Sequence, residues 1–166
     1  MVANWAGNVV FSTDRLHEPR TVDELQQLVA STPTLRALGT GHSFNRIADT
    51  TGDLVSVRAL AVPTEIDAAA RTVRVGAGTR YGELASELDR HGWALHNLGS
   101  LPHISVAGAC ATGTHGSGSG NGCLATAAVA VDFVAGDNVQ TLHLQTMSST
   151  SPTDKARDAL RARQRK

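Results

Sequence analysis

The chain of 166 residues has few cysteines, no excess of charge of either sign and no long hydrophobic run. Its two cysteines, Cys110 and Cys123, are too few and wrongly spaced for a zinc site or a disulfide scaffold. A formal net charge of zero argues against a nucleic-acid binder. The sequence contains no run of about 18 apolar residues, the length needed to span a membrane. With no secretory leader pattern, these absences predict a globular cytoplasmic protein with buried or partly buried thiols and no membrane or nucleic-acid partner.

Charge is nevertheless unevenly distributed along the chain. Residues 151–166 hold six Lys or Arg and two Asp, a local charge of +4, so the remaining 150 residues carry −4. A polar stretch rich in Ser and Thr, residues 148–153, precedes this basic end. Because such a composition can bury little apolar surface, residues 145–166 are predicted to form a linker or disordered tail, with a short charged helix over 153–165 as the alternative.

Two glycine-rich loops that carry histidines are the most informative feature present. The first is Gly39-Thr40-Gly41-His42-Ser43, and the second spans residues 99–118 with two further histidines. Glycines let backbone N–H groups approach anionic oxygens closely. Two such loops in one small domain predict a large phosphorylated cofactor bound along its length, with His42 as a group that could react with it.

The remaining pattern predicts an alternation of short strands and helices. Thr21 and Glu24 have the spacing of a capping box, which predicts a helix over 21–31. A second helix is predicted over 80–90, ending at Gly92, and Ser105 is predicted to cap a short helix over 106–111 whose N-terminus would seat a pyrophosphate. Strands are predicted at 9–11, 35–38 and 54–57, a hairpin at 65–67 and 72–75, a long buried strand over 126–134 and a return strand over 139–144.

The same residues offer two alternative kinds of chemistry. A metal site built from His42, His103 and His115 lacks the spacing of a metal-binding helix or hairpin. Structural roles are therefore favoured for His103 and His115, either hydrogen bonds to loop carbonyls or a place at the edge of the bound cofactor. Ser100 and Ser105 lack the Gly-x-Ser-x-Gly context of a serine nucleophile.

Three motifs in order carry a family resemblance. They are Asn4-Trp5-Ala6-Gly7-Asn8, the loop 39–45, and the segment 100–108 followed by 111–116. Over residues 3 to about 144 they resemble the N-terminal FAD-binding domain of the alditol oxidase (xylitol oxidase-like) family, within the vanillyl-alcohol oxidase, or PCMH-type, flavoproteins. The resemblance implies an α+β fold in which two small α+β subdomains clamp FAD.

The resemblance also implies roles for particular residues. His42 would form a covalent bond to the 8-methyl carbon of the flavin, residues 37–43 would wrap the pyrophosphate, and Ser100 would be the catalytic residue at the flavin face. The implied cofactor-binding residues are Ala37, Leu38, Gly39, Thr40, Gly41, His42, Ser43, Ser100, Ser105, Gly108, Ala109, Cys110 and Ala111, and no metal is expected.

The implied activity is oxidation of a polyol CH–OH group with dioxygen, giving hydrogen peroxide. An aldonolactone oxidase acting on a gulono- or arabinono-1,4-lactone is one alternative, and a non-catalytic remnant or binding module with a basic tail is another. Family enzymes are far longer and carry a C-terminal substrate domain, and residues 145–166 resemble nothing in them. We therefore expect an FAD-binding domain over 1–144 that lacks its C-terminal part, exposes apolar surface at an unpaired sheet edge, and is inactive alone.

Overall fold

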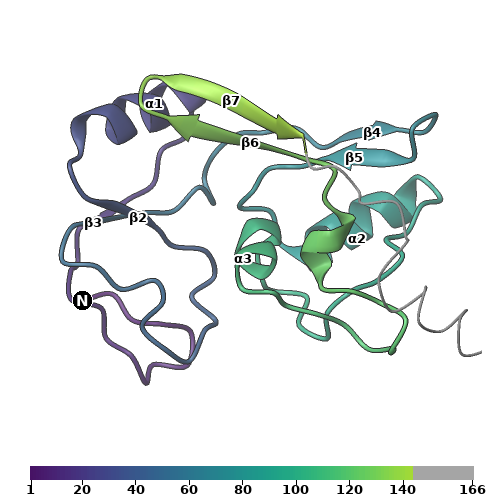
Figure 1. Ribbon diagram of the computed structural model, residues 1–166, viewed down its shortest axis with the longest axis horizontal. Helices are drawn as coiled ribbons and strands as arrows, with labels where there is room; N and C mark the ends of the chain where they lie inside the picture. Colours follow the sequence, from purple (N-terminus) through teal and green to yellow (C-terminus); the bar gives the residue numbers. More distant parts are fainter. Residues whose placement is uncertain (144–166) are drawn as a thin grey trace, which may run out of the picture.

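Residues 1–143 form two groups of short helices and strands, each around its own small core, in the computed structural model (Figure 1). The structure describes these residues only, so the predicted tail over 145–166 lies outside it. One sheet is parallel and two are antiparallel hairpins, and helices accompany both groups, which confirms the predicted α+β class. Among the described residues no helix combines the length and the apolar character needed to cross a membrane.

The first group is built on a three-stranded parallel sheet in the order β1-β3-β2. Its elements are β1 (Leu16–His17), α1 (Val22–Ser31), β2 (Leu35–Ala37) and β3 (Asp53–Val55). Val9, Phe11 and Leu54 form the core beneath this sheet. The parallel register pairs Leu54 of the central strand with Leu16 on one side and Arg36 on the other. Strand β2, which leads into the first glycine loop, is therefore an edge strand that is paired with the central strand β3 alone.

The predicted strand at 9–11 is wrong, although its apolar residues are buried as expected. This segment folds back on the chain start: Asn4 N–H donates to the Val9 carbonyl at 2.9 Å and Phe11 N–H to the Val2 carbonyl at 2.9 Å. Gly7, at φ +72°, makes the reversal between them. The tight turn leaves room for one isolated bridge, between Ala3 and Val10, and for no ladder.

Helix α1 begins where the capping signal places it. The Thr21 hydroxyl accepts a hydrogen bond from Glu24 N–H at 3.2 Å, and Thr21 has extended backbone geometry. The second half of the predicted box differs, because the Glu24 carboxylate accepts from Arg20 N–H at 2.7 Å instead of from Thr21. Both interactions satisfy N–H groups at the helix start, so the predicted helix is confirmed with one changed partner.

The second group packs helices beside a hairpin. Its elements are β4 (Glu65–Asp67), β5 (Thr72–Arg74), α2 (Tyr81–Arg90), α3 (Val106–Ala111) and the 3₁₀ helix η1 (Leu124–Ala127). The core consists of Tyr81, Ile104, Ala109 and Leu124. The predicted hairpin and the helix ahead of Gly92 are confirmed, and Gly92 takes the left-handed φ of +73° that is typical after a helix end.

A long hairpin, β6 (Ala130–Ala135) and β7 (Asn138–His143), crosses from the second group toward α1 (Figure 1). The Gln26 side-chain amide on α1 donates to the Asp137 carbonyl at the hairpin turn (2.5 Å). The predicted buried strand over 126–134 is wrong in its start and its burial: η1 occupies 124–127, and Val131 and Phe133 are 44% and 41% exposed. Only two strands pair here within residues 1–143.

Candidate cofactor site between two glycine loops

The first glycine loop is held by the segment that opens the chain. Trp5 N–H donates to the Gly41 carbonyl at 2.8 Å, and the Asn4 side-chain amide donates to the Ser43 carbonyl at 2.9 Å. Asn4 is buried, and its side-chain oxygen accepts from Val9 N–H at 3.0 Å. Gly41 has φ +68°, a conformation that other residues adopt only with strain. The loop therefore has one defined course, set by contacts on both sides of Gly41.

The two loops meet through Thr40. Its hydroxyl accepts a hydrogen bond from Ser105 N–H at 2.8 Å and donates to the His103 carbonyl at 3.4 Å. These contacts join a loop of the first group to a loop of the second. Thr40 is thus the link that brings the two predicted glycine loops into one place.

Two glycines at this junction leave room for the side chain of Ser105. A Cβ atom added at Gly39 would lie 2.9 Å from the Ser105 hydroxyl oxygen, and one added at Gly108 would lie 2.6 Å from it. Both distances are below van der Waals contact, so a side chain at either position would displace Ser105. The two glycines form the walls of a narrow cradle around a single hydroxyl.

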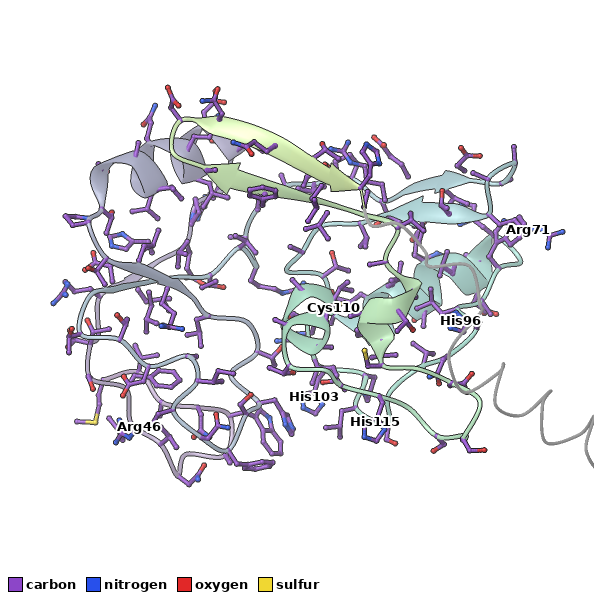
Figure 2. All side chains as sticks on the ribbon, in the orientation of Figure 1. Arg46, Arg71, His96, His103, Cys110 and His115 are labelled. Atoms are coloured by element: carbon purple, nitrogen blue, oxygen red, sulfur yellow. The ribbon has the colours of Figure 1, made fainter. Side chains whose placement is uncertain are left out.

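An aromatic cluster lies beside the cradle. The His42 imidazole stacks on the Trp5 indole, with ring centroids 4.5 Å apart and planes 20° from parallel. His103 stacks on the same indole at 5.4 Å, and the two imidazole centroids are 5.1 Å apart. Figure 2 shows His103 on the side of the second group that faces the first. The histidines predicted from two separate loops therefore share one site.

Three buried side-chain atoms in this region have no hydrogen-bond partner: His42 Nε2, His103 Nε2 and Ser105 Oγ. Buried polar atoms are nearly always paired, because an unpaired one costs about 1–3 kcal/mol. All three belong to the two loops, and they are the atoms of this kind found within residues 1–143. Free hydrogen-bonding atoms beside a glycine-walled cradle fit a large polar ligand, and FAD is a group of that kind.

The predicted role of Ser105 as a helix cap is wrong. Ser105 occupies the N-cap position of α3, but its side chain makes no capping hydrogen bond. The first N–H groups of the helix are taken instead by the turn before α2: Val106 N–H donates to the Thr79 carbonyl and Ala107 N–H to the Ala77 carbonyl. The predicted pyrophosphate seat at this helix N-terminus therefore lacks these two donors, and the free Ser105 hydroxyl points to a different role.

The other predicted site residues lie around this junction in varied settings. Ala37 ends β2, Leu38 packs on the first core, and Ala109 is part of the second core. Ser100 is exposed in the loop before α3, and Ala111 is exposed at the end of that helix. Their contacts with a cofactor, like those of the glycines, remain predictions.

Cys110 lies on the core side of α3, with its sulfur 3.9 Å from the Tyr81 hydroxyl. Burial raises the pKa of the Cys110 thiol, and it also raises the pKa of the Tyr81 hydroxyl. Both groups are therefore held in their neutral forms. Cys110 and Cys123 are free and partly buried, as predicted.

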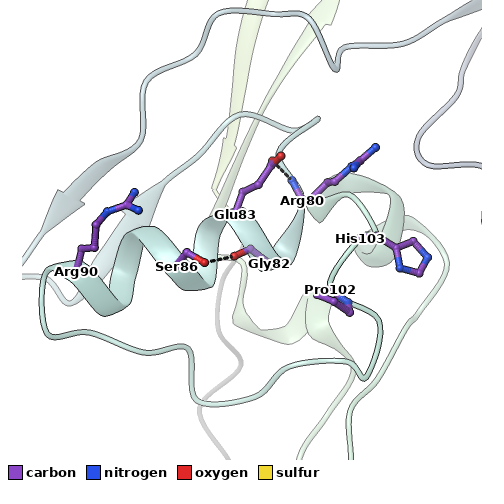
Figure 3. Close-up of a pocket in the computed structure, with 7 residues that line it drawn as sticks. All are labelled: Arg80, Gly82, Glu83, Ser86, Arg90, Pro102 and His103. Atoms are coloured by element: carbon purple, nitrogen blue, oxygen red, sulfur yellow. Dashed lines mark hydrogen bonds between the residues drawn. The ribbon is translucent and has the colours of Figure 1, made fainter.

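A shallow pocket lies next to the site, along α2 from its N-cap to its last residue (Figure 3). It shares His103 with the aromatic cluster. Its polar groups are largely engaged: Glu83 pairs with Arg58 at 2.5 Å and accepts from Arg80 N–H at 3.0 Å, and these bonds lower the pKa of the Glu83 carboxyl. The unpartnered atoms are on the loops, so the glycine junction remains the stronger candidate site. The pocket is lined by Arg80, Gly82, Glu83, Ser86, Arg90, Pro102 and His103.

His115 behaves as a structural loop residue. Its Nδ1 lies 3.1 Å from the Gly116 carbonyl, in agreement with the predicted hydrogen bond to a loop carbonyl. No group of three His, Cys, Asp or Glu in the described part of the chain is arranged to hold a metal ion. Asn4 and Trp5 hold the first loop, a role that residue patterns did not predict, and Thr40, which is a predicted cofactor-binding residue, also joins the two loops. The Asn-Trp pair near the chain start was the available signal.

Known proteins show which family the chain belongs to. The FAD binding domain family matches residues 13–141. Alditol oxidase of a Streptomyces species is 51% identical over 142 residues, covering 84% of this chain and 34% of its own length. L-gulonolactone oxidase of Mus musculus is 32% identical over 138 residues, covering 81% of this chain and 31% of the enzyme. The chain thus spans about a third of the length of these relatives.

The same fold occurs in a solved structure of low sequence similarity. Cholesterol oxidase from B. sterolicum superposes with a TM-score of 0.71 at 17% identity, over 85% of this chain and 31% of that one. Its fold agrees with the α+β arrangement of two groups described above. On the family match and the strong similarity to alditol oxidase, this chain belongs to the family of FAD-binding domains.

Proposed function

We propose that this chain binds FAD at the junction of its two glycine loops and is the cofactor-binding part of an alditol oxidase-type oxidoreductase. The observation that carries the proposal is the set of three unpartnered buried atoms, His42 Nε2, His103 Nε2 and Ser105 Oγ, on loops of a chain 51% identical to alditol oxidase. When bound, FAD accepts a hydride from an alcohol carbon and passes the electrons to dioxygen. The substrate class that follows is a polyol or related sugar alcohol.

Different residues around the junction are proposed to make different contacts with FAD. Gly39 and Gly108 leave room for the Ser105 hydroxyl, which has no hydrogen-bond partner and is free to donate to the cofactor or accept from it. Ala37, Leu38, Thr40, Gly41 and Ser43 belong to the first loop or the strand that leads into it, and Ala109, Cys110 and Ala111 are proposed to contribute the backbone of α3 to the cofactor site. Ser100, on the exposed loop, is proposed to face the reacting end of the cofactor.

His42 is proposed to bind FAD covalently. A neutral imidazole nitrogen is a competent nucleophile, and Nε2 of His42 is buried without a partner that would occupy its lone pair or proton. The stacked ring is held in one place before any ligand arrives. Positioning of this kind removes much of the entropic cost of bond formation.

A lactone substrate is the second candidate. It is supported by the 32% identity to L-gulonolactone oxidase, and it would use the same FAD-binding junction. Because the chain spans about a third of either relative, we expect no turnover from these 166 residues alone with a polyol or a lactone. We further propose a cytoplasmic setting for the domain over 1–144, which is supported by two cysteines that remain unpaired.

The test is denaturing electrophoresis of the chain produced with FAD, viewed under ultraviolet light after acid fixation. We expect a fluorescent band that is absent in His42→Ala and retained in His115→Ala, the matched histidine of the second loop. Flavin that copurifies but leaves the denatured band dark would support binding without the bond. Absence of flavin from the folded native protein would overturn the proposal of an FAD site.

A further inference from the structure

We propose that Trp5 is a positioning residue for His42, its indole holding the imidazole in the orientation needed for bond formation with FAD. This inference rests on the function proposed above and extends it to a residue outside both glycine loops. The bond would join a ring nitrogen of His42 to the 8-methyl carbon of the flavin. The imidazole N–H and the 8-methyl group each lose one hydrogen atom. Dioxygen accepts these two hydrogen atoms, that is two protons and two electrons, and becomes hydrogen peroxide.

The indole of Trp5 is placed by its backbone and contributes little to a core. Trp5 is 59% exposed and belongs to neither core cluster. The backbone N–H of Trp5 nevertheless donates to the carbonyl of Gly41 at 2.8 Å, and Gly41 immediately precedes His42 in the chain. The neighbouring Asn4 side chain donates to the Ser43 carbonyl, immediately after His42. These two bonds hold the loop on either side of His42 against the segment that carries the indole.

Ring packing is the interaction that sets the His42 orientation. Active histidines are usually oriented by a hydrogen bond to one ring nitrogen, but Nε2 of His42 has no partner. Three rings contact the imidazole instead: Trp5 at 4.5 Å with a 20° interplanar angle, Phe44 edge-on at 5.5 Å, and His103 tilted at 5.1 Å. The indole is the nearest and the most nearly parallel of the three.

The same indole couples the two histidines. His103 stacks on Trp5 at 5.4 Å and 22°, and its Nε2 is also buried and unpartnered. Loss of the indole would therefore release both imidazoles, one on each glycine loop. Aromatic stacking is strong enough to change the rate of a step that depends on ring orientation by about 3- to 10-fold.

The experiment follows covalent flavin incorporation with time in three variants of the full chain. Trp5→Leu removes the stack, Trp5→Phe keeps an aromatic face, and Trp93→Phe changes the other tryptophan of the chain as a matched control. Non-covalent FAD affinity and the NMR shifts of the His42 ring protons are measured alongside. We expect Trp5→Leu to link flavin about 3- to 10-fold more slowly at unchanged FAD affinity, with the ring-current shift of His42 lost, and Trp5→Phe to restore most of the rate.

The outcomes separate this inference from the function on which it rests. A wild-type chain that binds FAD and never links it overturns covalent attachment, and the role of Trp5 with it. A wild-type chain that links flavin while Trp5→Leu links it equally fast overturns the role of Trp5 alone. Equal slowing in Trp5→Leu and Trp5→Phe, together with weaker FAD binding in both, would also overturn it, because the residue would then act on loop folding.

Discussion

The hydroxyl of Ser105 sits where two glycines leave room for it, which makes Gly108 sensitive to a single added methyl group. In Gly108→Ala the new Cβ would lie 2.6 Å from Ser105 Oγ, and Gly39 closes the other side. We expect a loss of about 1–3 kcal/mol in the free energy of unfolding, measured by urea denaturation. This overpacking outweighs the gain of about 1 kcal/mol that alanine brings to a helix.

Two variants control that prediction. Ser105→Ala in the Gly108→Ala background removes the offending oxygen, so stability should return to the level of Ser105→Ala or above. Gly120→Ala adds a methyl group with no atom within 4 Å and should change stability by less than about 0.5 kcal/mol. An unchanged free energy of unfolding in Gly108→Ala would show that the space between the two glycines is wider than described.

Asn4 offers a second residue-scale prediction. Its buried side chain bonds Val9 N–H, the Ser43 carbonyl and the Asn8 side chain. Asn4→Ala leaves Val9 N–H buried without that acceptor, which should cost about 1–3 kcal/mol of unfolding free energy. Asn8→Ala, at an exposed position in the same turn, should cost much less. Equal losses in the two variants would contradict a specific role for Asn4.

At the residue scale, local patterns predicted the glycines and His42 but not their neighbours. Gly39, Gly41 and Gly108 are recognisable because they lie in glycine-rich loops of the sequence. In the structure Gly39 and Gly108 lie beside the Ser105 hydroxyl, and Gly41 has a φ of +68°. The stacking of His42 on Trp5 and the Thr40–Ser105 hydrogen bond join residues far apart in sequence. No periodicity or spacing encodes such contacts, so they became visible only with the fold.

At the scale of elements, α1 provides a direct test of a predicted cap. Thr21→Ala removes the acceptor for Glu24 N–H and should lower the free energy of unfolding by about 1 kcal/mol. Thr21→Ser keeps the hydroxyl and should be close to wild type in the same urea titration. A loss of similar size in both would indicate that the Thr21 methyl group, and not the cap, supports the helix.

The helices were predictable because their signals are local, whereas the strands were less so. Thr21 and Gly92 mark helix ends by chemistry within one turn of the helix. Strand β1 has two residues and exists only because Leu16 pairs with Leu54. The apolar pattern of segment 126–134 predicts a continuous buried strand. In the structure the 3₁₀ helix η1 includes the first residues of this segment, and most residues of β6 are exposed to solvent. Tertiary pairing decides such short segments.

For the whole molecule, paired carboxylates predict loss of stability in acid. Hydrogen bonds from Ser12 N–H and the Arg46 side chain lower the pKa of Asp49 to about 2, and the Arg15 and His17 side chains lower the pKa of Asp53. Because these pKa values are depressed in the folded state, the contribution is fully present above the ordinary value near 4 and is lost as the pH falls through about 2.

Urea midpoints between pH 6 and pH 2 measure this contribution. Wild type should lose stability below pH 4, and Asp49→Asn should be less stable near neutrality and show a shallower decline. Asp67→Asn, at the exposed end of β4, keeps an acceptor for Ala70 N–H, provides the matched control and should follow the wild-type curve. A wild-type midpoint that stays constant from pH 4 to pH 2 would contradict the depressed pKa values.

The β6–β7 hairpin has a practical consequence for anyone who handles this chain in solution. Val131 pairs in register with Leu142, Phe133 follows on the same face, and all three are 41% to 54% exposed. Strand edges of this kind add further strands readily, and β-branched and aromatic side chains favour the process. Concentrated samples should therefore self-associate through this hairpin, and this association between folded chains will limit the usable protein concentration.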